Sequence, residues 1–75
     1  MIEIWSKPQC PFCDKAENLC IKKKFEYKKY MLDVDFTRED LFEKFPSART
    51  FPQITIDGQL IGGYTEFEAK VNSET

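Results

Sequence analysis

The stretch Lys7-Pro8-Gln9-Cys10-Pro11-Phe12-Cys13-Asp14 decides the fold, because it places two cysteines three residues apart where one pattern gives way to another. A short alternating apolar segment precedes it, and apolar residues at helical spacing follow it. Pro11 suits the first position of a helix, where its missing N–H would be unpaired in any case. We therefore expect a strand, then the cysteine pair, then a helix from about residue 11 to residue 24.

The expected position of Cys10 at the helix start favours a reactive thiol. Its sulfur would face free backbone N–H groups and the positive end of the helix dipole, with Lys7 close in sequence, and all three favour thiolate over thiol. Residues i and i+3 share one face of a helix, so the sulfur of Cys13 can meet that of Cys10. Cys13, one turn inside the helix, suits a resolving thiol. The pair predicts redox chemistry.

Two structural interpretations of the cysteine pair are weaker. A structural zinc site usually takes four Cys or His ligands, and the chain has three cysteines and no histidine. A disulfide between residues three apart closes too small a loop to constrain the unfolded chain much. We therefore expect no metal. The missing histidine also excludes a Cys–His nucleophile pair.

Other residues of this predicted helix have simpler interpretations. Cys20 falls on the same inward stripe as Cys13 and Ala16, and a packing role is preferred over a regulatory thiol. The run 22–24 consists of lysines in the last helical turn, where cations complement the dipole. A solvated helix end explains this run better than a binding patch.

Length and charge narrow the function classes. The 75 residues make a single domain spanning residues 1–75. The 11 basic and 13 acidic side chains give a net charge of −2, which favours neither nucleic acid nor an anionic membrane as partner. No apolar run reaches membrane-spanning length, and we expect no secretory leader. A cytoplasmic protein with reduced cysteines is the simplest interpretation.

The rest of the chain predicts a βαβαββα order. Thr37 and Asp40 nearly match a capping box, and Leu41, Phe42 and Phe45 supply a buried face. Asp57-Gly58 is a two-residue hairpin turn, and Thr65 to Glu68 match a capping box that begins a last helix. The expected strands are residues 1–5, 25–32, 53–56 and 59–61, and the expected helices are 11–24, 37–45 and 65–71.

Three motifs in this order resemble a known family. They are residues 7–13, the segment Thr50-Phe51-Pro52-Gln53-Ile54, and the segment Gly62-Gly63-Tyr64-Thr65-Glu66. At these motifs the chain resembles a glutaredoxin of the dithiol type, with Cys-Pro-Phe-Cys as its active motif. The resemblance implies a thioredoxin fold, of class α/β, with a four-stranded mixed sheet flanked by three helices.

The resemblance also implies roles for single residues. Cys10 would be the nucleophile and Cys13 the resolving thiol, and Phe51–Pro52 would be a cis peptide bond beside them. Lys7 and Arg49 would lie near the glycine carboxylate of glutathione, and the third motif would hold its γ-glutamyl end. The implied glutathione-binding residues are Lys7, Phe12, Arg49, Thr50, Phe51, Pro52, Gly63, Thr65 and Glu66.

The implied function is a glutathione-dependent thiol–disulfide oxidoreductase that reduces protein disulfides and glutathione mixed disulfides. It would serve electron transport and cell redox homeostasis as a monomer, with ribonucleotide reductase a family-typical electron acceptor. A carrier reduced by thioredoxin reductase is one alternative, which the Gly-Gly-Tyr-Thr segment argues against. A [2Fe–2S] cluster carrier is another, but Pro11 and Cys13 favour dithiol chemistry.

Four positions depart from the commonest family pattern and bear on glutathione affinity. Phe12 replaces Tyr, Glu39 replaces Gln, Phe51 replaces Val, and Glu66 replaces Asp.

Overall fold

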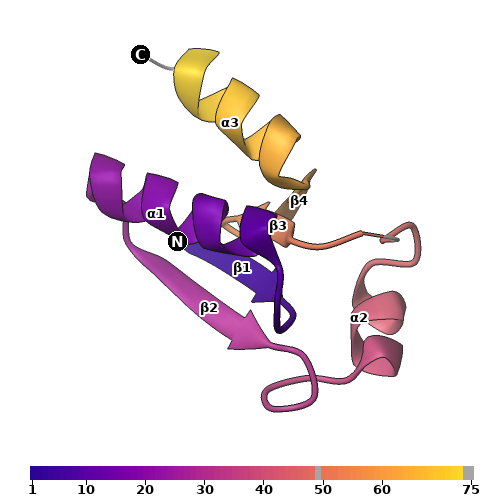
Figure 1. Cartoon of the computed structure of the whole chain (residues 1–75). Helices are drawn as coiled ribbons and strands as arrows, with labels where there is room; N and C mark the ends of the chain where they lie inside the picture. Colours follow the sequence, from indigo (N-terminus) through magenta and orange to yellow (C-terminus); the bar gives the residue numbers. More distant parts are fainter. Residues whose placement is uncertain (49, 74–75) are drawn as a thin grey trace.

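The computed structural model describes residues 1–48 and 50–73. Within them the chain follows the predicted βαβαββα order (Figure 1). The elements are β1 (Ile2–Ser6), α1 (Pro11–Lys23), β2 (Tyr27–Met31), α2 (Arg38–Lys44), β3 (Gln53–Ile56), β4 (Gln59–Gly62) and α3 (Tyr64–Ser73). Their ends differ from the predicted ends by two residues at most, the usual uncertainty of such boundaries.

The four strands form one mixed sheet in the order β2-β1-β3-β4. β1 runs parallel to β2, with Ile4 opposite Lys29, and antiparallel to β3, with Ile4 opposite Ile54. β3 and β4 form the predicted hairpin, and Asp57 and Gly58 both have positive φ, at 51° and 85°. Positive φ at both positions is what a tight turn between twisted strands requires. This topology confirms the predicted thioredoxin fold.

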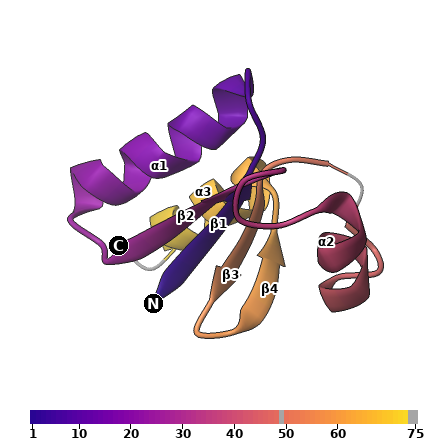
Figure 2. The same ribbon diagram turned by 90° about the horizontal axis from the view of Figure 1, so that it is seen from below.

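The alternation along β1 divides the core into two clusters, one on each face of the sheet. Ile4 packs in the cluster covered by α1 and α3, whereas the next residue, Trp5, packs in the cluster covered by α2. α1 and α3 lie beside each other in Figure 1, and the view in Figure 2 separates α2 from both. The first cluster is Ile2, Ile4, Ala16, Cys20, Ile54, Phe67 and Val71, and the second is Trp5, Leu32, Phe36, Leu41, Phe45 and Ala48.

Local chemistry accounts for the ends of the first two helices. Cys10 caps the start of α1 and Pro11 occupies its first turn, while Lys24 ends it in the left-handed conformation with φ 60°. Thr37 caps α2 with the predicted box, because its hydroxyl accepts from the N–H of Asp40 at 3.1 Å and the carboxylate of Asp40 accepts from the N–H of Thr37 at 3.1 Å. Such caps satisfy N–H groups that have no intrahelical acceptor.

One residue predicted to be buried is exposed, and one predicted strand begins later than expected. Phe42 is 47% exposed, because Leu41 and Phe45, four residues apart on one face of α2, fill the contact with Trp5. Phe25 is 37% exposed and precedes β2, which begins only at Tyr27. The prediction of a buried Phe42 and of a strand from residue 25 was therefore wrong.

The predicted capping role of Thr65 was also wrong. α3 begins at Tyr64, one residue earlier than expected, so Thr65 lies inside the first turn. The carboxylate of Glu66 accepts from the N–H of Gly63 at 3.0 Å, and the carbonyl of Gly63 accepts the N–H of Phe67 at 3.0 Å. Gly63 is therefore the N-cap residue. Glu66, three positions later, makes one of the two hydrogen bonds of a capping box, and the other is missing because glycine has no side chain.

Among the described helices, none has the length and apolar character needed to cross a bilayer.

Candidate active site

The cysteine pair lies at the start of α1, where the sequence predicts it. Cys10 is extended, with φ −121° and ψ 99°, and its sulfur accepts a hydrogen bond from the N–H of Cys13 at 3.2 Å. The sulfur thus takes the place that a Ser or Asp oxygen fills at ordinary helix starts. An N–H donor and the positive end of the helix dipole both act on it.

The two cysteines are joined as a disulfide, with their Cα atoms 5.3 Å apart. Cys10 is 7% exposed and Cys13 is 1% exposed. The structure therefore represents the oxidised form of the pair. Of the two sulfur-bearing residues, Cys10 is the better placed for an incoming thiol or disulfide, as expected of a nucleophile.

The loop before β3 lies against the start of α3. Phe51–Pro52 is a cis peptide bond, as the family resemblance implies, and Pro52 is fully buried. A Cβ at Gly63 would lie 3.5 Å from the carbonyl oxygen of Pro52, so the two backbones pass close to each other. This contact brings the second and third sequence motifs together.

A pocket of about 230 Å³ opens between these segments and the start of α1. Phe12, which stands between the two cysteines, forms one wall, so the pocket adjoins the dithiol. Seven of the nine predicted glutathione-binding residues line it. They are Phe12, Thr50, Phe51, Pro52, Gly63, Thr65 and Glu66.

The other two predicted glutathione-binding residues are Lys7 and Arg49. Lys7 does not line the pocket, but its Nζ is 5.9 Å from the ring centroid of Phe51, at the edge of the site. Arg49 lies outside the described residues. Glu39, one of the departures from the family pattern, is exposed in the first turn of α2 and is not part of the pocket wall.

The sequence reasoning missed two residues at the site. Tyr64 lines the pocket with its ring 6.1 Å from that of Phe12, and its hydroxyl donates to Glu68 at 2.7 Å. That hydrogen bond raises the pKa of Tyr64 above the ordinary value of a tyrosine. Arg38 places its guanidinium carbon 5.9 Å from the ring centroid of Phe51. Tyr64 stands within the third motif and could have been found there, whereas nothing in the sequence marked Arg38.

The third cysteine takes no part in the site. Cys20 is fully buried in the cluster under α1 and α3 and is a free thiol. Burial, and secondarily the charge of Glu17, raises the pKa of Cys20 to about 11. At neutral pH it is a protonated apolar group, which agrees with its predicted packing role.

Over residues 1–48 and 50–73 we find no group of three or more His, Cys, Asp or Glu side chains that could hold a metal ion.

Known proteins resemble the chain along nearly its whole length. The family model described as Glutaredoxin matches residues 2–61. A glutaredoxin of Haemophilus influenzae is 36% identical over 80 residues, covering 97% of this chain and 92% of the relative. The solved structure of reduced Escherichia coli glutaredoxin superposes with a TM-score of 0.74 at 37% identity, covering 96% of this chain and 93% of that one. The crystal structure of a buckwheat glutaredoxin–glutathione complex superposes with a TM-score of 0.82 at 23% identity, covering 97% of this chain and 69% of the buckwheat chain.

Proposed function

Since this chain belongs to the glutaredoxin family, and is therefore a thiol–disulfide oxidoreductase, we propose that it reduces protein disulfides and glutathione mixed disulfides with glutathione as reductant. One observation carries the proposal. The dithiol adjoins, through Phe12, a pocket whose walls come from all three sequence motifs. The buckwheat protein, which has the same fold, is solved with glutathione bound.

The reaction begins with Cys10 as a thiolate. It attacks one sulfur of the substrate disulfide, and the other sulfur leaves as a thiolate that takes up a proton. In the resulting mixed disulfide, the thiol of Cys13 loses its proton and attacks the sulfur of Cys10. The substrate's second thiol is released and the Cys10–Cys13 disulfide closes, so two electrons pass from the protein to the substrate.

Two glutathione molecules then restore the dithiol. The first opens the Cys10–Cys13 disulfide and forms a mixed disulfide with Cys10. The second attacks the glutathione sulfur of this mixed disulfide and releases oxidised glutathione. Where the substrate is itself a glutathione mixed disulfide, Cys10 takes the glutathione from the substrate and a second glutathione removes it from Cys10. This route does not need Cys13.

The pocket and its edge offer a matching group for each end of glutathione. The backbone N–H and C=O of Phe51 can pair with the tripeptide as an added strand. Tyr64 and Thr65 lie in the first turn of α3, where N–H groups lack intrahelical acceptors and suit the γ-glutamyl carboxylate. The carboxylate of Glu66 suits the neighbouring ammonium, and Lys7 suits the glycine carboxylate at the opposite end.

Coupled assays test the proposal. We expect the protein to reduce a glutathionylated peptide when glutathione and glutathione reductase supply electrons, and not when thioredoxin reductase replaces them. Turnover with thioredoxin reductase alone would overturn the choice of reductant.

A variant pair tests the pocket. Lys7→Gln should raise the KM for glutathione about two- to fivefold, the range expected for one exposed ion pair. Lys28→Gln removes the same charge from β2, away from the pocket, and should leave KM unchanged. Equal effects of the two substitutions would contradict the assignment of Lys7.

A further inference from the structure

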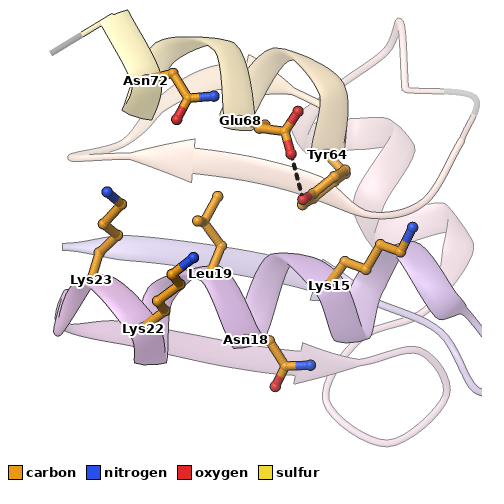
Figure 3. A pocket seen from close by; sticks show the side chains of 8 residues that line it. All are labelled: Lys15, Asn18, Leu19, Lys22, Lys23, Tyr64, Glu68 and Asn72. Atoms are coloured by element: carbon orange, nitrogen blue, oxygen red, sulfur yellow. Dashed lines mark hydrogen bonds between the residues drawn. The ribbon is translucent and has the colours of Figure 1, made fainter. Parts of the chain in front are cut away.

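A second and larger depression, of about 440 Å³, runs between α1 and α3 (Figure 3). Leu19 rises from α1 into it, and Tyr64 and Glu68 face it from α3. Three lysines line it, namely Lys15, Lys22 and Lys23. We call it the α1–α3 groove.

The groove neighbours the active site. Tyr64 lines both the groove and the smaller pocket beside the dithiol. Lys15 holds its Nζ 5.1 Å from the ring centroid of Phe12, which stands between the two cysteines. A chain attached to the sulfur of Cys10 therefore has a path past Phe12 and Tyr64 into the groove.

The charge of the groove opposes that of the whole chain. Its lining carries three lysines against the single carboxylate of Glu68, whereas the chain has a net charge of −2. Glu68 already accepts the hydroxyl of Tyr64. In the described part of the chain, none of the three lysines pairs with a carboxylate, whereas Lys29 and the N-terminus do. The groove thus presents cations that remain available to an anionic partner.

The spacing of the lysines suits an extended peptide. Lys15 and Lys22 are seven residues apart on one helix, which is about 10.5 Å along its axis. An extended chain covers that distance in about three residues. Acidic side chains at every third position of a bound segment can therefore meet both lysines in turn, with apolar contact to Leu19 between them.

From this geometry we propose that the α1–α3 groove docks an acidic, extended segment of a protein substrate next to its reactive disulfide. The inference rests on the thiol–disulfide exchange proposed above and names the class of protein it acts on. Lys22 and Lys23 then do more than complement the helix dipole: they select the substrate.

The test uses two synthetic peptides that differ only in charge. Each carries one cysteine as a 2-pyridyl mixed disulfide, with Glu at every third flanking position in one peptide and Gln in the other. The pre-reduced protein reacts with each peptide in the absence of glutathione, and released pyridine-2-thione reports the second-order rate. In this step Cys10 displaces pyridine-2-thione from the peptide sulfur, and Cys13 then releases the peptide thiol.

We expect the Glu peptide to react about fivefold faster than the Gln peptide at low salt, as two exposed ion pairs allow. The double variant Lys22→Gln/Lys23→Gln should lower that preference to about twofold, because the pair with Lys15 remains, and should leave the rate with the Gln peptide unchanged. The control Lys24→Gln/Lys28→Gln lowers the net charge equally at exposed positions outside the groove, and should keep the preference.

Two results would overturn the inference: no charge preference in the unaltered protein, or an equal loss in both double variants, which would indicate a long-range field instead of docking. Circular dichroism of each variant checks that it is folded. Because no glutathione is present, a failure of the proposed glutathione dependence would leave these rates intact, so the two failures can be told apart.

Discussion

Cys10 and Cys20 lie on or beside the same helix and are both shielded from water, yet their environments are opposite in kind. Cys10 is 7% exposed, at the N-terminal end of α1, and its sulfur accepts a backbone N–H. Cys20 is 0% exposed, among apolar side chains under α1 and α3, and burial raises its pKa to about 11. Burial alone therefore does not separate the two thiols. What separates them is the presence of N–H donors and the positive helix end at Cys10.

The largest expected effect is the loss of disulfide exchange when the nucleophilic thiol is removed. Cys10→Ser should reduce disulfide exchange to the uncatalysed rate, because a hydroxyl at this position is not ionised at neutral pH. Cys20→Ala should keep nearly full activity, since the core thiol is not exposed to substrate. Initial rates with a glutathionylated peptide measure both. Comparable losses of activity in the two variants would contradict the claim that Cys10 is the reactive thiol and Cys20 is not.

A more selective effect is expected at Cys13. Cys13→Ser should retain exchange with glutathione mixed disulfides, which needs one thiol, and should lose reduction of protein disulfides, which needs two. Parallel assays with a glutathionylated peptide and with a disulfide-bonded protein measure the two activities. Loss of both in the Cys13 variant would mean that Cys13, and not Cys10 alone, starts the reaction.

The smallest expected effect is on stability. Folding raises the pKa of Cys20 from 9.0 to about 11. The protonated thiol therefore contributes its full stabilisation of the folded state below pH 9, and this stabilisation is lost as the pH rises toward 11, because the unfolded chain loses the proton first. The loss should be on the order of 2 kcal/mol in the free energy of unfolding.

Urea unfolding from pH 7 to pH 11 measures this loss. The parent is Cys10→Ser/Cys13→Ser, in which Cys20 is the only thiol. The matched control adds Cys20→Ala to the same parent. Three tyrosines also have raised pKa values, and because they are present in both proteins, the difference between the two pH profiles reports Cys20. Parallel pH profiles of the two proteins would show that the core thiol does not titrate as described.

Local sequence signals predict helix starts and tight turns well. The helix start at Pro11, the capping box at Thr37 and the turn at Asp57-Gly58 each depend on a few neighbouring residues, and the structure has all three. The inward stripe of α1 also follows from helical spacing, and it correctly places Cys20 in the core.

Contacts between distant elements were harder to predict. Thr65 is a residue type that often caps helices, but α3 begins one residue earlier, and Gly63 takes the cap with its N–H donating to Glu66. Phe42 is as apolar as Phe45, yet only Phe45 faces Trp5 across the second cluster. The approach of Arg38 to Phe51 joins residues thirteen apart in sequence and leaves no local pattern. The α1–α3 groove likewise exists only once the two helices pack side by side.

The central claim is that the start of α1 holds Cys10 as a thiolate. The most direct test is the rate of iodoacetamide alkylation of the reduced protein against pH, with the modified cysteine identified by mass spectrometry. We predict that Cys10 reacts with an apparent pKa well below the ordinary thiol value of about 8.5, while Cys20 stays unreactive until near its raised pKa of about 11. An apparent pKa for Cys10 at or above about 8.5 would contradict the account.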